Sequence, residues 1–242
     1  MSDPDVNAPR PATEFTARRN SAAVIDFDDG VDFAAASHGL VAQHATGRIE
    51  KNGRPVWDTA HHDFLRTDES APDTVHPGLW RQGKLNAVHG LFQVADGVWQ
   101  ARGYDISNIT FIEADSGWLI IDPLTAEECA RACLELANEH LGERPVSAVI
   151  YTHSHLDHFG GMLGVTTREA VADGDVRVIA PEGFMHEAVG ENVLAGPIMG
   201  RRSMYQFGPL LPFGPQGQVD AGLGKTVPLG TSGLVAPTEL IL

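Results

Sequence analysis

The chain has 242 residues, enough for one domain with a sizeable core. Its 17 Lys and Arg against 32 Asp and Glu give a net charge of −15, which argues against nucleic acid or an anionic lipid surface as a partner. No apolar run approaches the ~18 residues of a membrane span, and the N-terminus lacks the basic and apolar pattern of a leader. The sequence therefore predicts an acidic, cytoplasmic protein with no membrane segment.

The first part of the chain gives a weak signal. Residues 1–22 are rich in Pro, Ala, Asp, Asn and Arg without apolar periodicity, which predicts a flexible tail. Residues 23–97 are expected to form an N-terminal extension with little assignable structure, because turn-rich sequence such as Asn52-Gly53 interrupts them. Within this extension, the segment from Val31 to Val41 is compatible with a short helix.

From Val98 the pattern indicates a partial α/β domain over residues 98–242. Continuous apolar runs predict buried strands, and apolar residues at helical spacing over residues 126–141 predict an amphipathic helix that Gly142 ends. The other expected elements, in chain order, are strands 98–101, 106–114, 118–121 and 146–151, a short helix from His158, strand 176–180 and helix 181–194.

The last part of the chain changes character. Residues 196–237 are rich in glycine and proline, which predicts a long segment of loops. The apolar run over residues 238–242 has the pattern of a strand. Between these regions lies the densest cluster of polar groups in the chain.

That cluster is His153-x-His155-x-Asp157-His158, directly after the expected strand 146–151. Side chains alternate along an extended chain, so His153 and His155 are expected to project to the same side and hold one cation. The chain then turns into a helix, which directs Asp157 and His158 toward a second position. Imidazole and carboxylate together are typical zinc ligands. The alternative is three neighbouring histidines of no special role, which this spacing disfavours.

The same residues resemble the metal motif of the metallo-β-lactamase superfamily. Further segments narrow the resemblance to its alkyl sulfatase branch, and these are residues 85–92, 96–100, 102–112, 180–185 and 236–241. The resemblance covers the chain from about residue 25 onward. It implies an αββα sandwich, of which this chain is expected to hold an incomplete, N-terminal part.

The resemblance also implies a chemistry. Family members hydrolyse linear alkyl sulfate esters to alcohol and sulfate with two zinc ions. It implies that His153 and His155 belong to the first metal, and Asp157 and His158 to the second. The family's remaining ligands, its dimerisation region and a sterol-carrier-like domain lie further downstream than this chain extends, and its full-length members are expected to be homodimers.

Two other functions compete with this one. A generic hydrolase of the superfamily would act on thioesters, lactones or β-lactams, although the sulfatase-like segments count against it. A truncated, catalytically silent chain would bind metal weakly, since four ligands shared between two metals leave both sites under-coordinated.

The remaining candidates have weaker signals. His186 could be a substitute ligand but is expected to be partly buried or at the surface. His89 is expected to form local hydrogen bonds, and His61-His62 are expected to be solvated. Cys129 and Cys133, one helical turn apart, indicate core packing. Tyr104, Asp105 and Asn108 could line a cleft or form a structural turn. Four residues of the loop-rich segment could form an apolar wall for an alkyl chain or be loop residues packed on the core, and these are Phe207, Leu210, Leu211 and Phe213.

Overall fold

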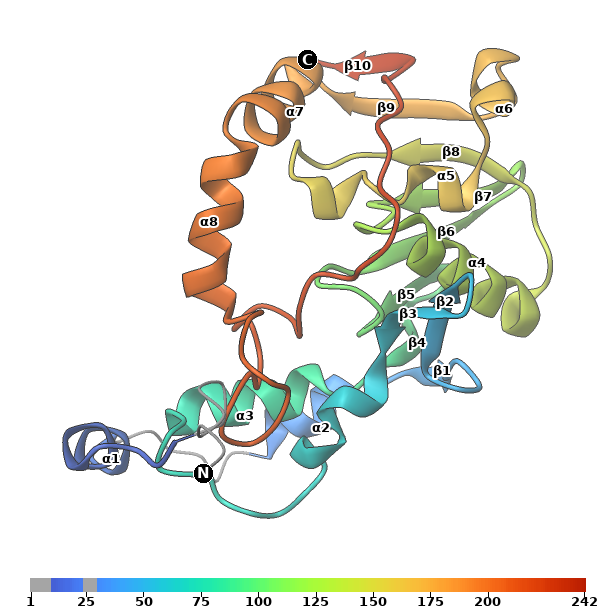
Figure 1. The fold of residues 1–242 in the computed structure, drawn as a ribbon. Coiled ribbons are helices and arrows are strands. Elements are labelled where there is room, and N and C mark those ends of the chain that lie inside the picture. Colours follow the sequence, from blue (N-terminus) through green and yellow to red (C-terminus); the bar gives the residue numbers. More distant parts are fainter. Residues whose placement is uncertain (1–9, 24–29) are drawn as a thin grey trace.

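A mixed sheet of eight strands forms the centre of the protein in a computed structural model that describes residues 10–23 and 30–242 (Figure 1). Its spatial order is β1-β4-β5-β6-β7-β8-β9-β10. The strands are β1 (Leu40–Ala42), β4 (Gly90–Ala95), β5 (Val98–Arg102), β6 (Ile109–Ala114), β7 (Gly117–Ile121), β8 (Val146–Ile150), β9 (Arg177–Pro181) and β10 (Glu239–Ile241). The strands from β1 to β7 pair antiparallel, and those from β7 to β10 pair parallel. Parallel neighbours need crossover connections, which bring helices to this half of the sheet.

The elements outside the large sheet are mostly short. A separate hairpin consists of β2 (Arg48–Lys51) and β3 (Arg54–Asp58). The α-helices are α1 (Glu14–Ser21), α2 (Val31–Ser37), α3 (Pro77–Asn86), α4 (Glu127–Leu141), α5 (Met162–Val165), α6 (Arg168–Ala172), α7 (Phe184–Val189) and α8 (Gly196–Phe207). The other helical turns are η1 (Thr59–Leu65), η2 (Leu156–His158) and η3 (Gly190–Leu194), of which η3 is π-helical.

The main core lies between the sheet and α4. Trp118 and Ile120 of β7 are completely buried there, and the Trp118 indole donates to Asn138 of α4 at 2.8 Å. Cys129 and Cys133 are buried on the same helix, which confirms their predicted packing role. The alternate residues of the central strands, on the opposite face of the sheet, are only partly buried, and these are Ile112, Leu119, Ile121, Ile150 and Ile179.

Most of the elements expected after residue 98 are confirmed. The strands and helix α4 lie where the apolar runs predicted them, Gly142 ends α4 with φ 100°, and the final apolar run forms β10. Strand β6 begins at Ile109 rather than Ile106, because residues 103–108 form a turn. The predicted helix 181–194 is divided into α7 and η3.

The prediction of a flexible tail is wrong for residues 14–21. They form α1, whose N-cap Thr13 accepts a hydrogen bond from Thr16 N at 3.2 Å. The helix has no buried residue, which is why apolar periodicity could not reveal it. Residues 1–9 of the predicted tail lie outside the described residues.

The prediction of little structure over residues 23–97 is also wrong. Short elements from α2 to β4 follow one another there, and the expected helix ends at Ser37 before β1 begins. Strand β4 joins the large sheet beside β5, and Leu65 and Trp80 pack with Val219 in a second, small core. Long-range contacts, rather than local pattern, stabilise these elements. The division of the chain into separate domains at residues 22 and 97 stays a prediction.

The prediction of loops throughout residues 196–237 is wrong at its start, because α8 occupies Gly196–Phe207. Pro197 lies in the first turn, where a helix tolerates proline, and the glycines that suggested a loop are accommodated within the helix. In Figure 1 this helix stands apart from the sheet, opposite the carboxyl ends of the parallel strands.

Candidate functional site

The motif residues lie in the loop after β8, at the edge where the parallel strands end. Strand β8 ends at Ile150, and Tyr151 extends it by donating from its backbone N to Ile179 O at 2.9 Å. The Tyr151 ring is buried and stacks on Phe184 at 5.0 Å. A rigid core segment therefore leads directly into His153.

The four predicted metal ligands lie together. His153 Nε2 is 3.0 Å from His155 Nδ1, and the rings of His153 and His158 are 4.0 Å apart. His158 Nε2 is 3.2 Å from Asp157 Oδ2. Among the residues that the structure describes, however, no group of three or more His, Cys, Asp or Glu is arranged to hold a metal ion. The donor types and their proximity fit zinc, but in this conformation the donors face one another.

Asp122, the residue directly after the expected strand 118–121, supports this cluster. It follows β7, the strand beside β8, with φ 54°. Its carboxylate accepts hydrogen bonds from Thr152 N at 2.8 Å and Thr152 Oγ1 at 2.7 Å. His158 Nδ1 also donates to it, at 2.8 Å. A carboxylate directly after a buried parallel strand, one strand away from a histidine motif, is the signal that could have identified it.

Charges within the cluster set its protonation. Burial lowers the pKa of His158, but its hydrogen bonds to Asp122 and Asp157 outweigh this effect and raise the pKa to about 9. Burial also opposes ionisation of Asp157, yet the contact with His158 keeps the pKa of that carboxyl below its usual value. Burial and the neighbouring imidazoles lower the pKa of His153. Without a metal, the cluster therefore holds a proton on His158 between two carboxylates.

The glycines after the motif permit a close backbone approach. Gly161 N donates to Leu124 O at 2.8 Å, and a Cβ at Gly161 would lie only 2.1 Å from Pro123 O. The hydroxyl of Ser107 donates to the carbonyl of Asp157. The motif loop is thus hydrogen-bonded to the segment after β7 and to the turn before β6.

A cavity of about 610 Å³ opens beside the cluster. His155, Asp157 and His158 line one side of it, and α8 lines another. Glu191, which precedes α8, has its Oε1 3.6 Å from His155 Nε2. The lining residues beyond the motif include Ile106, Met199, Arg202, Phe207, Leu223 and Val227. The cavity therefore combines three of the four candidate metal ligands with an arginine and an apolar wall.

Only one of the four predicted wall residues from the loop-rich segment lines this cavity. Phe207 lies at the end of α8 and does so, whereas Leu210, Leu211 and Phe213 are exposed elsewhere. Sequence reasoning missed the rest of α8, because it assigned no helix there.

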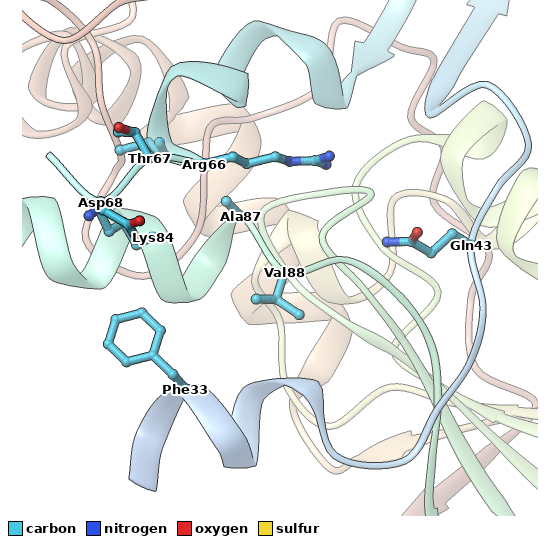
Figure 2. A pocket seen from close by; sticks show the side chains of 9 residues that line it. Phe33, Gln43, Arg66, Thr67, Asp68, Lys84, Ala87 and Val88 are labelled. Carbon is cyan, nitrogen blue, oxygen red and sulfur yellow. The ribbon is translucent and has the colours of Figure 1, made fainter. Parts of the chain in front are cut away.

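A second cavity, of about 650 Å³, lies away from the motif (Figure 2). Its lining includes Phe33, Leu65 and Val88, and the charged side chains of Arg66 and Lys84. Figure 2 shows Arg66 reaching across it toward Gln43. None of the predicted metal ligands lines this cavity, so the cavity of about 610 Å³ beside the motif is the candidate functional site.

The other candidates have structural roles. His186 is exposed on α7 with Nδ1 3.1 Å from Glu187 Oε1, which confirms its surface position. His89 Nδ1 lies 3.0 Å from Ala87 O, which confirms the predicted local hydrogen bond.

Asp105 is buried and accepts hydrogen bonds from Thr125 N and Oγ1 at 2.9 and 2.7 Å, so it supports a turn. The Tyr104 ring is buried in the core, whereas Asn108 is exposed.

The prediction that His61 and His62 are solvated is wrong for His62. The chain is not extended there but forms η1, which turns His62 inward. His62 Nε2 donates to Gln218 Oε1 at 3.1 Å in a buried contact, and the His61 ring stacks on Phe213 at 4.7 Å.

Comparison with known proteins identifies relatives of this fold and motif. The sequence profile of the metallo-beta-lactamase superfamily matches residues 102–239. A linear primary-alkylsulfatase from Pseudomonas sp. is 45% identical over 235 residues, and an (R)-specific secondary-alkylsulfatase from Pseudomonas sp. is 46% identical over 235 residues. Each match covers 96% of this chain and 35% of the relative, so the chain spans about a third of the length of these relatives.

A solved structure is similar as well. The stereoselective inverting sec-alkylsulfatase from Pseudomonas sp. superposes with a TM-score of 0.91 and 45% identity, over 98% of this chain and 38% of the other. The expected fold is thereby confirmed. No helix among the described residues has both the length and the hydropathy to cross a membrane.

Proposed function

Because the chain belongs to the metallo-β-lactamase superfamily, we propose that it carries part of a zinc centre that hydrolyses linear alkyl sulfate esters to alcohol and sulfate. The observation that carries this proposal is the cluster of His153, His155, Asp157 and His158, of which the last three line a cavity with an apolar wall. The 45% identity to a linear primary-alkylsulfatase supports the substrate class. The cytoplasmic location and the homodimer of full-length members stay predictions.

The proposal assigns His153 and His155 to a first zinc ion, and Asp157 and His158 to a second. Bound zinc would supply a Lewis acid and an activated hydroxide for attack on the ester. The protein's own part is to present the ligands in the right state. Asp122 holds Nδ1 of His158 and thus leaves Nε2 of that ring for a metal. To bind, His158 must lose the proton on Nε2, the atom that lies 3.2 Å from Asp157 Oδ2.

The cavity offers a place for each part of the substrate. A sulfate monoester is an anion, and the net charge of −15 repels it at long range. Arg202, on the cavity side of α8, supplies a local positive charge for the sulfate group. Met199, Phe207 and Val227 supply apolar surface for the alkyl chain.

A catalytically silent chain is the competing proposal. The observation that favours it is that no three donors converge on one point among the described residues. Zinc would then bind weakly, without turnover. A hydrolase of thioesters, lactones or β-lactams is the third proposal, and the identity to alkylsulfatases weighs against it.

Sulfate release from octyl sulfate by the zinc-loaded chain distinguishes these proposals. The sulfatase proposal predicts octanol and sulfate in equal amounts, abolished in His155→Ala and retained in His186→Ala, the exposed control. Zinc binding without sulfate release would support the silent chain. Hydrolysis of a thioester, lactone or β-lactam but not of octyl sulfate would support the third proposal.

A further inference from the structure

A tight turn over residues 220–225 places Leu223 between two pockets. Ala221 N donates to Gly224 O at 2.8 Å, and Gly222, at φ 89°, donates from its N to Asp220 Oδ1 at 2.7 Å. Leu223, at the tip, is 57% exposed although it lines the 610 Å³ cavity. It also lines a neighbouring pocket of about 280 Å³. Its apolar side chain therefore forms part of the wall of both pockets.

A buried ion pair anchors both ends of this turn. Lys225 Nζ lies 3.2 Å from Asp220 Oδ2, and these side chains are only 4% and 0% exposed. Asn86 Nδ2 donates to Asp220 at 3.1 Å, and Lys225 Nζ donates to Gly83 O, so both charges are tied to α3. Gln218 Nε2 donates to Lys225 O at 2.7 Å. Buried charges are unfavourable unless they are paired in this way, which makes the anchor rigid but sensitive to change.

The turn is also pressed against the loop that supports the metal motif. A Cβ at Gly224 would lie 2.5 Å from Ile106 O, so only glycine permits this approach. The next residue of that loop, Ser107, donates to the carbonyl of Asp157. A continuous chain of contacts therefore runs from α3 through the turn to the candidate ligands.

We infer that the Asp220–Lys225 pair positions Leu223 as a fixed wall of the cavity, and that Leu223 contacts the organic group of the ligand and so selects for its length. The identification of that ligand as an alkyl sulfate rests on the proposed function. The pair is a positioning device, since it does not itself line the 610 Å³ cavity.

Binding of alkyl sulfates below their micelle concentration tests this inference by calorimetry on the zinc-loaded chain. Wild type is expected to bind octyl sulfate more tightly than butyl sulfate. Leu223→Ala is expected to weaken octyl sulfate binding about five- to tenfold and leave inorganic sulfate binding unchanged. Leu229→Ala is the matched control, because Leu229 is 85% exposed and does not line the cavity; its octyl sulfate affinity should remain within twofold of wild type.

The positioning role has its own readout. Asp220→Asn combined with Lys225→Met removes both charges and leaves neither unpaired. This variant should reduce the octyl-to-butyl affinity ratio as Leu223→Ala does, while circular dichroism shows a folded chain. An unchanged ratio in the folded double variant would overturn the positioning role.

Two outcomes separate this inference from the proposed function. If Leu223→Ala and Leu229→Ala bind octyl sulfate equally, or wild type does not bind it, the inference about Leu223 is overturned. If wild type binds octyl sulfate with the expected length dependence but releases no sulfate, the hydrolase proposal fails and the inference holds.

Discussion

Asp122 and His158 are joined by a hydrogen bond of 2.8 Å that links the end of β7 to the loop after β8, its parallel neighbour. The same carboxylate holds the backbone and hydroxyl of Thr152, immediately before the motif. One side chain thus fixes both the path of the loop and the orientation of an imidazole. This relationship leads to the first prediction.

Asp122→Asn should weaken zinc binding about 10- to 100-fold, the range typical when a partner of a metal-bound histidine is lost. Asparagine tolerates the left-handed backbone at this position, so the fold should persist. Its amide would donate toward Nδ1 of His158 and favour the tautomer that carries its proton on Nε2. Competition with a chromophoric chelator measures the affinity. An affinity within threefold of wild type would show that Asp122 does not orient His158.

Arg202→Ala should weaken inorganic sulfate binding to the zinc-loaded chain about three- to tenfold, because an exposed charge in water contributes modestly. Arg201→Ala is the matched control, since Arg201 is the preceding residue of α8 but does not line the cavity. Calorimetric titration at constant ionic strength provides the measurement. Equal losses in both variants would indicate a general charge effect rather than a sulfate contact.

His62 should make stability depend on pH. Burial lowers its pKa from 6.5 to about 4, with its hydrogen bond to Gln218 opposing the shift. Between these values the unfolded chain binds the proton and the folded chain does not, so the free energy of unfolding should fall as pH falls from 6.5 to 4. The contribution is at most about 3 kcal/mol. Urea unfolding at several pH values should show a shallower dependence in His62→Gln than in His61→Gln; identical slopes would exclude this role.

Gly161→Ala should destabilise the protein by about 3 kcal/mol or more, because its Cβ would meet Pro123 O at 2.1 Å and Ala126 O at 2.8 Å. Gly190→Ala is the control, because nothing lies within 4 Å of a Cβ there and the backbone is helical. Alanine at Gly190 should be neutral or stabilise by up to about 1 kcal/mol. Thermal unfolding measures both. Similar midpoints for the two variants would contradict the close packing below the motif.

Local sequence pattern predicted the strands and helix α4 after Val98, but it did not predict α8 or most of the elements before β5. Apolar runs such as Trp118–Ile121 give a strong strand pattern, and Trp118 and Ile120 of this run are buried in the main core with α4. Helix α8 buries no residue and contains glycine and proline, so its sequence resembles a loop. The elements before β5 are short and depend on partners far along the chain, such as Val219 for Leu65.

The residues of the candidate site also fall into two groups, those that local sequence predicts and those that only the three-dimensional fold brings together. His153, His155, Asp157 and His158 are close in sequence, so their proximity follows from the turn after β8. Asp122 and the wall of α8 reach the cluster only through sheet pairing and chain path, which single-sequence reasoning does not supply. The inward turn of His62 likewise depends on η1, a 3-10 helix that the local sequence pattern did not predict.

The zinc content of the purified chain after dialysis against metal-free buffer is the most direct test of the central claim, that the 153–158 loop binds zinc. Plasma mass spectrometry should find zinc in wild type and in His186→Ala, and a clear loss in His153→Ala and His155→Ala, with all four proteins folded by circular dichroism. Zinc that is absent from the wild type, or that persists unchanged in both motif variants, would contradict the account.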